Sequence, residues 1–178
     1  MIKRGLLIGR FQPPHLGHLS VIKQILQEKD EVIIVVAAAQ LSHTTKNPLT
    51  AGERITLIRI MLIEENIDPI KYWIIPANDI MDNPLWVHHI KRLTPKFDTF
   101  YGNNQFTKML FEEAGFEVTQ TGIVNRGEFE GTKIRSNLME GEDLNNAINP
   151  DVIELLSEWK IQDRLIACRN ENPVSDLV

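Results

Sequence analysis

Gly5-Leu-Leu-Ile-Gly9-Arg10-Phe11-Gln-Pro-Pro-His15-Leu-Gly-His18 joins an apolar run to the start of a helical pattern. An apolar run followed by glycine and proline predicts a strand, a tight turn and then a helix. The first amides of a helix lack partners within it, so this junction is a favourable place for an anion. His15 and His18 share one face of the first helical turn, and Arg10 adds a positive charge. Together these groups indicate a site for a polyphosphate.

Apolar segments alternate with helical patterns along the rest of the chain. We predict strands at 5–8, 32–36, 71–76, 97–101 and 116–119, and helices at 16–28, 51–65, 84–93 and 106–114, from 131 and from 150. The β-branched run at 32–36 is typical of a strand buried on both faces. Strands that alternate with helices predict right-handed βαβ units. The expected fold class is therefore α/β, a single-domain, Rossmann-like, doubly wound parallel sheet with C-terminal helices.

The composition is that of an ordinary globular domain. The chain has 178 residues, of which 43% are hydrophobic and 24% charged, and its net charge is −5. We expect one domain over residues 1–169 and a polar, frayed tail over 170–178. The negative charge argues against a general binder of nucleic acid or of anionic membranes. The single cysteine, Cys168, and the absence of a signal peptide predict a cytoplasmic protein without disulfides.

Polar motifs follow the ends of the predicted strands. They occupy residues 9–18, 39–43, 77–79 and 102–104. In an open α/β sheet, ligands bind beyond the carboxyl ends of the strands, where the strand order reverses. We therefore expect these motifs to face one binding crevice. The polar loop at 40–50 is either a simple connection or a lid over that crevice.

Two helix starts add information. Thr50 and Glu53 form a capping box, so capping explains Glu53, and an ion pair explains Arg54, better than catalysis does. Gly131-Thr132 opens a later helix whose free amides and hydroxyl offer a second phosphate site, with Arg135 within its first turn or so. In isolation, an N-cap followed by an exposed basic helix is the better explanation of that segment.

The opening motif resembles the H-x-G-H signature of the nucleotidylyltransferase superfamily. Its longer form, Gly9–His18, is similar to that of the archaeal nicotinamide mononucleotide (NMN) adenylyltransferases. Gly131–Arg135 resembles the second signature of the superfamily, although Glu130 stands where that signature has serine. Residues 40–54 resemble an archaeal loop ending in Thr-Ala-Gly-Glu-Arg, with Lys46 in place of a phosphate-binding arginine. A lysine keeps the positive charge but loses the bidentate fork.

The resemblance extends from Gly5 to about Ile166 and implies roles for particular residues. For ATP it implies catalytic or phosphate contacts by Arg10, His15, His18, Lys46 and Arg135, and further contacts by Gly9, Phe11, Arg126, Gly131 and Thr132. For NMN it implies contacts by Asp79, Ile80, Asn83, Trp86 and Asn104. Most tryptophans are core residues, as expected for Trp73 and Trp159, but Trp86 is implied to stack on the nicotinamide. A cationic ring favours an aromatic face and a nearby carboxylate.

The implied reaction joins ATP and NMN to give NAD and pyrophosphate. The phosphate of NMN attacks the α-phosphorus of ATP in line, because neither signature supplies an obvious nucleophile. We expect Mg²⁺ to arrive with ATP and expect no metal site built by the protein, since the sequence shows no clustered carboxylates. The resemblance also implies a homo-oligomer, commonly a hexamer among archaeal relatives.

Other functions are compatible with parts of this sequence. A different adenylyl- or cytidylyltransferase on the same scaffold would act on FMN, phosphopantetheine or an alcohol phosphate. A class I aminoacyl-tRNA synthetase shares a histidine signature, but this chain is short and lacks a Lys-Met-Ser-Lys-Ser loop. A non-catalytic sensor of NAD or ATP would bind nucleotide without releasing pyrophosphate. The acceptor that consumes ATP distinguishes these alternatives.

Overall fold

The structure, a computed structural model, describes residues 2–122 and 129–171. Within these residues, five parallel strands form one sheet in the order β3-β2-β1-β4-β5. The strands are β1 (Arg4–Gly9), β2 (Glu31–Val36), β3 (Tyr72–Pro76), β4 (Thr99–Tyr101) and β5 (Glu117–Thr119). Because β1 pairs with β2 on one side and with β4 on the other, the strand order reverses at β1. The carboxyl ends of β1 and β4 therefore border the crevice where this type of sheet binds ligands.

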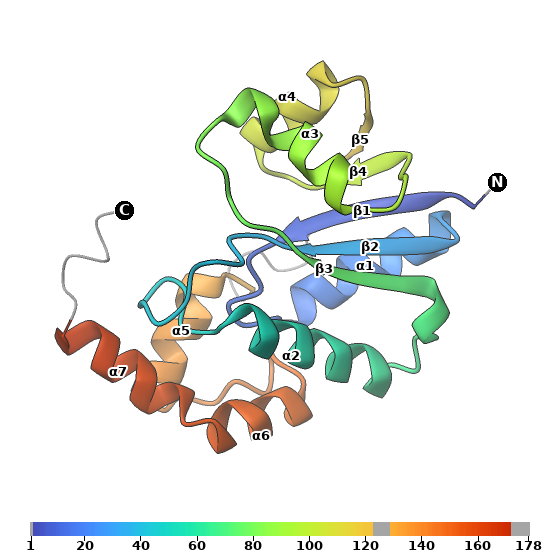
Figure 1. The fold of residues 1–178 in the computed structure, drawn as a ribbon. Coiled ribbons are helices and arrows are strands. Elements are labelled where there is room, and N and C mark those ends of the chain that lie inside the picture. Colours follow the sequence, from blue (N-terminus) through green and yellow to red (C-terminus); the bar gives the residue numbers. More distant parts are fainter. Residues whose placement is uncertain (1, 123–128, 172–178) are drawn as a thin grey trace.

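Helices cover both faces of the sheet (Figure 1). One face carries α3 (Asn83–Leu93) and α4 (Gln105–Glu113). The other carries α1 (Leu16–Glu28), α2 (Ala51–Glu64), α5 (Gly131–Glu140), α6 (Pro150–Glu158) and α7 (Ile161–Glu171). A short 3-10 helix, η1 (Pro69–Lys71), precedes β3. None of the helices described is long and apolar enough to cross a membrane. The predicted Rossmann-like α/β fold is confirmed.

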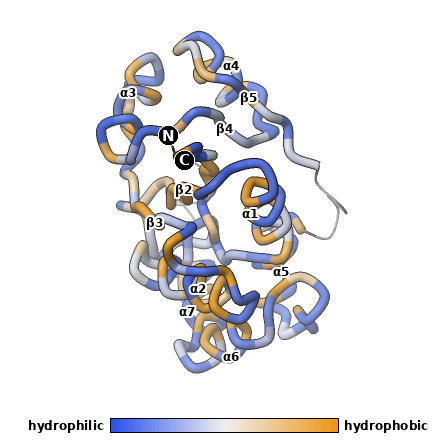
Figure 2. Tube along the Cα trace, turned by 90° about the vertical axis from the view of Figure 1, so that its right-hand side faces the viewer, coloured by the Kyte–Doolittle hydropathy of each residue, from blue (hydrophilic) through white to orange (hydrophobic). Residues whose placement is uncertain are grey.

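The central strand β2 shows how the apolar sequence forms two cores. Val32, Ile34 and Val36 pack in the core that includes α1 and α2, whereas Ile33 and Val35 pack in the core that includes α3 and α4. All are fully buried, because successive side chains of a strand point to opposite faces and both faces are covered. Figure 2 shows the apolar residues of the larger core where α2, α6 and α7 lie together.

Two features differ from the sequence-based expectation. The first is α7, a helix with little apolar periodicity that buries mainly Ile161 and Leu165 and continues to Glu171, past residue 169. The second is Trp73, which was expected in the core but is 45% exposed. Trp73 lies on β3, one of the two edge strands of the described sheet, and its indole N–H donates to Glu31 at 2.7 Å. Trp159 does pack against the larger core.

Candidate active site

The turn after β1 is held in an unusual backbone conformation. Phe11 has a φ of +51°, and the bond between Gln12 and Pro13 is cis. A Cβ atom added to Gly9 would lie 3.1 Å from the Phe11 ring and 3.5 Å from Nε2 of His18. Because glycine leaves this space open, the Phe11 ring packs over the end of β1 and against His18, with ring centroids 4.4 Å apart. The turn thus fixes the position of the second histidine.

The rings of His15 and His18 lie against each other at the start of α1, tilted by 30°. Their ring centroids are 3.7 Å apart, and the amide of His15 donates to Nδ1 of His18 at 3.2 Å. A backbone amide can only donate, so Nδ1 of His18 carries no proton and the neutral ring carries its proton on Nε2. His18 therefore presents an N–H donor from its Nε2 atom.

Burial keeps both imidazoles neutral at physiological pH. It lowers the pKa of His15 from the ordinary 6.5 to about 4. Burial, together with repulsion from His15, also lowers the pKa of His18 well below its ordinary value. Neutral donors suit a site where negative charge develops without a proton being transferred.

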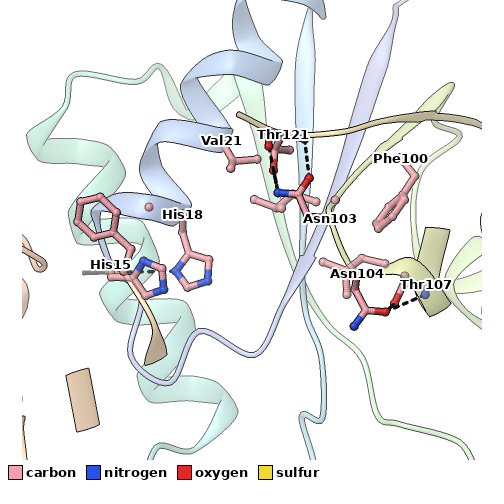
Figure 3. Close-up of a pocket in the computed structure, with 13 residues that line it drawn as sticks. His15, His18, Val21, Phe100, Asn103, Asn104, Thr107 and Thr121 are labelled. Carbon is pink, nitrogen blue, oxygen red and sulfur yellow. Dashed lines mark hydrogen bonds between the residues drawn. The ribbon is translucent and has the colours of Figure 1, made fainter. Parts of the chain in front are cut away.

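One cavity, of about 320 Å³, opens between the ends of β1 and β4. Figure 3 shows His15 and His18 on one side of it and Asn104 and Thr107 on the other. Apolar side chains, Val21, Phe100 and Phe129 among them, form much of its wall. This mixture of an apolar wall and a few polar groups is typical of a site for a planar, heteroatom-rich ligand such as a nucleobase. The cavity will be called the crevice pocket.

A second cavity, of about 410 Å³, shares both histidines and has a basic lining. The residues that line it are Arg10, Phe11, Gln12, Pro13, His15, His18, Lys46, Gly131, Thr132 and Arg135. It brings together eight of the residues that the sequence assigned to ATP. It also receives the N-terminus of α5, where free amides favour an anion. This cavity will be called the basic pocket.

Arg10 repels Arg135 in the basic pocket. The guanidinium of Arg135 donates to the carbonyl oxygens of Thr45 and Gln12, at 3.1 and 3.0 Å, and to the hydroxyl of Thr132 at 3.3 Å. These acceptors are neutral. Burial, and then the charge of Arg10, lower the pKa of Arg135. An anion in the pocket would remove this repulsion, so the arrangement favours a polyphosphate.

The start of α1 differs from the expectation of free amides. The amide of Leu16 donates to the carbonyl of Ala147 at 2.8 Å, and the amide of His15 is bonded to His18. A Cβ atom at Gly17 would lie 2.9 Å from Phe129 and 3.0 Å from His15, so those residues fill the space over the glycine. Two of the amides expected to be free at this helix start are therefore already bonded. The helix start that lies at the basic pocket is that of α5, through Gly131 and Thr132.

The loop at 40–50 is fixed to the turn after β1. The buried side chain of Gln12 donates to the carbonyl of Leu49 and accepts from its amide, both at 2.9 Å. Arg135 holds the same loop through Thr45. The sequence analysis assigned no role to Gln12. Its position inside the opening motif is the signal that could have identified it. These bonds hold the loop in a position where Lys46 lines the basic pocket.

Arg54 is not in the expected ion pair. Its side chain is fully buried, and the guanidinium donates to four backbone carbonyl oxygens. The acceptors lie in the turn after β1, in the segment after β2 and at the start of α2. The expectation of an ion pair is wrong because these carbonyl groups satisfy the guanidinium. Glu53 instead completes the predicted capping box with Thr50 and pairs with Arg164 of α7 at 2.8 Å.

The residues assigned to NMN form two groups in the structure. Asp79, Ile80, Asn83 and Trp86 follow β3 and line neither the crevice pocket nor the basic pocket. Trp86 is half-buried, with its ring edge-on to Phe111 at 6.2 Å between centroids.

Asn104 is separate from that group, because it caps α4 and lines the crevice pocket. Next to it, Asn103 bonds the backbone and the hydroxyl of Thr121. Sequence reasoning missed Phe129 and Thr121, which reach the pocket only through the fold. Arg126, assigned to the nucleotide phosphates, lies outside the described residues.

Known proteins resemble this chain over most of its length. The signature of the cytidylyltransferase-like family matches residues 6–139. A nicotinamide-nucleotide adenylyltransferase of Thermoplasma volcanium is 46% identical over 155 residues, which cover 87% of this chain and 86% of that protein. The corresponding protein of Archaeoglobus fulgidus is 44% identical over 163 residues, covering 87% and 91%.

Solved structures share the fold. A bifunctional NMN adenylyltransferase/ADP ribose pyrophosphatase of Francisella tularensis, complexed with AMP and a Mn ion, superposes with a TM-score of 0.80 over 96% of this chain. The sequences are 21% identical, so the likeness concerns the fold alone. This chain covers 54% of that longer protein, about half of its length.

Proposed function

The chain belongs to the cytidylyltransferase-like family, and we propose that it is a nicotinamide-nucleotide adenylyltransferase, which transfers AMP from ATP to NMN to give NAD and pyrophosphate. The observation that carries the proposal is the pair of pockets that meet at His15 and His18. One pocket suits a nucleobase and the other a polyphosphate, and they adjoin at the point where the α-phosphate of a bound ATP would lie.

ATP fits the two pockets in one orientation, with its triphosphate in the basic pocket and its adenosine in the crevice pocket. Its triphosphate lies in the basic pocket, close to Arg10, Lys46 and Arg135 and to the N-terminus of α5. Its adenosine lies in the crevice pocket, where apolar walls face the ring. We therefore place Asn104 with the nucleoside of ATP, because it lines this pocket and its amide nitrogen is not used in the cap of α4.

The proposed chemistry needs positioning and charge stabilisation. The phosphate of NMN attacks the α-phosphorus of ATP, the bond to the β-phosphate oxygen breaks, and pyrophosphate leaves with the electron pair. The Nε2–H group of His18 donates to the α-phosphate as negative charge grows, and the cations of the basic pocket stabilise the leaving group. No protein nucleophile is required.

NMN is proposed to bind beside β3. The half-buried ring of Trp86 offers a face for the cationic nicotinamide, and the carboxylate of Asp79 adds an opposite charge. The amide of Asn83, at the start of α3, and the backbone of Ile80 complete the proposed set. This segment follows β3, which is separated from β4 by β2 and β1, so NMN approaches the same carboxyl edge of the sheet from its β3 end.

A divalent metal ion, Mg²⁺ in our proposal, accompanies the triphosphate. Among the residues described, no three His, Cys, Asp or Glu side chains gather to hold a metal ion. The residues present fit an ion held mainly by phosphate oxygens. When bound, the ion supplies charge neutralisation of the triphosphate. The cytoplasmic location and the homo-oligomer expected from the sequence stay predictions.

Pyrophosphate release tests the proposal. The purified protein is mixed with ATP and Mg²⁺, and NMN, nicotinic acid mononucleotide, FMN or phosphopantetheine is supplied separately. We expect pyrophosphate release with NMN and formation of NAD in equal amount. The rate of release with nicotinic acid mononucleotide, compared with that for NMN, shows which of the two pyridine nucleotides is preferred. Release only with FMN or phosphopantetheine would keep the ATP site but refute the Trp86 site. Tight ATP binding without release with any acceptor would indicate a sensor instead.

A further inference from the structure

Arg54 joins three segments that border the proposed active site. From the first turn of α2, its guanidinium donates to the carbonyl oxygen of Arg10 at 3.0 Å. It also donates to Ala37 at 2.8 Å and to Ala38 at 3.1 Å, and its Nε donates to Thr50 at 3.2 Å. The side chain has no solvent exposure. A fully buried cation at this place is costly unless its donors are satisfied, and here carbonyl oxygens satisfy them.

Two of the segments that Arg54 holds contain residues in the left-handed backbone region. Phe11, directly after Arg10, has a φ of +51°, and Ala38 has a φ of +49°. Such conformations are unfavourable for non-glycine residues and persist only where the surroundings determine them. The guanidinium is bonded next to both of them. Arg54 thus provides the contacts that keep both turns in place.

The two turns lead to opposite sides of the site. The first carries Arg10 and Phe11 into the basic pocket. The second leads to the proposed NMN segment, because the amide of Ala38 donates to Oδ1 of Asp79 at 3.3 Å. The side chain of Gln40 further bonds the backbone of Asp79 in both directions, at 3.0 and 3.3 Å. Through Arg54, the phosphate side and the acceptor side share one rigid support.

We infer that Arg54 is a positioning residue, which fixes the turn that carries Arg10 relative to the turn that holds Asp79. The inference rests on the proposed function, since it assigns the two turns to ATP and to NMN. An in-line transfer requires the two substrates to be aligned closely, and small misplacements of the reacting groups are costly. Arg54 lines neither pocket, and it contacts Arg10 of the basic pocket through the backbone carbonyl, so it acts through the backbone.

A planar guanidinium is required for this role. Its five N–H groups point outward in one plane and can reach carbonyl groups on several segments at once. A lysine ammonium keeps the charge but is compact, so it cannot reach the carbonyls on both turns together. Burial, and then repulsion from Arg10, lower the pKa of Arg54 to about 10, so the group stays charged at neutral pH.

The test compares Arg54→Lys with the matched control Arg59→Lys, an exposed arginine on the same helix. For Arg54→Lys we expect kcat/KM to fall by about 10- to 100-fold, with a loss in kcat, whereas the control stays at the wild-type value. A double-mutant cycle with Arg10→Ala measures whether Arg54 acts through Arg10. In the Arg10→Ala background, Arg54→Lys should cost about threefold or less. Additive losses, or near-normal kcat in folded Arg54→Lys, would overturn the inference.

Chemical rescue covers the case in which Arg54→Lys does not fold. Arg54→Ala is prepared with millimolar guanidinium ion or with methylammonium ion, which has no planar fork. We expect guanidinium alone to raise the thermal stability and to restore turnover. Equal rescue by both ions, or by neither, would show that the fork is not what the site needs.

ATP binding separates this inference from the proposed function. Calorimetric titration with ATP is carried out on the wild-type protein and on all members of the cycle. If the wild type releases no pyrophosphate with any acceptor, the proposed function fails, yet the coupling between Arg54 and Arg10 is still measured in the ATP affinity. We expect that coupling to be non-additive in affinity as well. Additive affinities would reject the role of Arg54 through Arg10 independently of catalysis.

Discussion

His18 is a donor whose tautomer is fixed by its surroundings. The amide of His15 donates to its Nδ1, and burial with repulsion from His15 lowers its pKa. The proton of the neutral ring therefore stays on Nε2. A donor that is already oriented needs no reorganisation when charge develops on a bound phosphate, which is why its loss is expected to affect turnover more than binding.

Removing this donor should reduce kcat. We expect His18→Ala to lower kcat by about 10²-fold or more, as for a lost charge-stabilising donor. His18→Asn is the sharper variant, because its amide oxygen can still accept from the His15 amide while the Nε2 donor is gone. Steady-state pyrophosphate release measures both variants, with His88→Ala on an exposed position of α3 as the control. Near-normal turnover in folded His18→Asn would contradict the assignment.

Trp86 is expected to affect the acceptor rather than ATP. Loss of an aromatic face beneath a cationic ring removes about 1–2 kcal/mol, so Trp86→Ala should raise KM for NMN by roughly tenfold. Trp86→Phe keeps the face and the contact with Phe111 and should recover most of the affinity. The control is Trp73→Ala, on the exposed edge strand. An increase confined to the KM for ATP would place Trp86 in the wrong subsite.

The sequence predicted most of the residues that line the basic pocket but not how they are supported. Arg10, His15 and His18 lie in one short motif, so order along the chain already placed them together. The role of Arg54 depends on carbonyl groups from three separate segments, and no sequence pattern reports where a carbonyl group points. The family resemblance assigned Asn104 to NMN, yet Asn104 lines the crevice pocket, which we propose holds the nucleoside of ATP.

At the scale of elements, α7 supports the start of α2. The guanidinium of Arg164 donates to both carboxylate oxygens of Glu53 at 2.8 Å and to the carbonyl of Pro48 at 3.1 Å. Glu53 in turn completes the capping box with Thr50. A helix with a weak apolar stripe therefore contributes through polar contacts. This is also the reason that periodicity did not predict α7, whereas caps and β-branched runs predicted the helix starts and the strands.

Breaking this contact should destabilise the fold. Arg164→Ala is expected to lower the free energy of unfolding by about 1–2 kcal/mol, because a bidentate, partly buried ion pair and one carbonyl bond are lost. Urea unfolding followed by circular dichroism measures the change. Arg169→Ala, further along α7, is the control and should unfold at the wild-type midpoint. The same midpoint for Arg164→Ala would mean that α7 packs by its apolar residues alone.

At the scale of the whole molecule, a negatively charged protein concentrates positive charge in one pocket. The chain carries a net charge of −5, yet the basic pocket gathers Arg10, Lys46 and Arg135. The two histidines beside them are neutral, so they add donors without adding charge. The consequence is a site whose groups are held ready by burial, and burial of titratable groups makes the stability of the fold depend on pH.

Glu53 and the histidine pair, in which burial lowers the pKa of both His15 and His18, predict separate windows of acid sensitivity. Burial raises the pKa of Glu53, but hydrogen bonds from Arg164 and Thr50 and the charge of Arg164 leave it below its ordinary 4.5. Because its folded pKa is lowered, its contribution is present above about pH 4.5 and is lost as the pH falls further. His15 acts at higher pH. Its pKa is 6.5 when unfolded and about 4 when folded, so between these values only the unfolded state binds the proton.

The fold should therefore lose stability as the pH falls from 6.5 to 4, by roughly 3 kcal/mol from His15 if the whole difference in pKa is expressed. Urea unfolding at pH 7, 5.5 and 4.5 measures this slope. His15→Asn keeps a good helix N-cap but removes the titrating ring, so its stability should change less between pH 7 and 4.5 than that of the wild type. Equal slopes for the two proteins would mean that His15 is protonated in the folded state, and the neutral pair proposed at the active site would then be wrong.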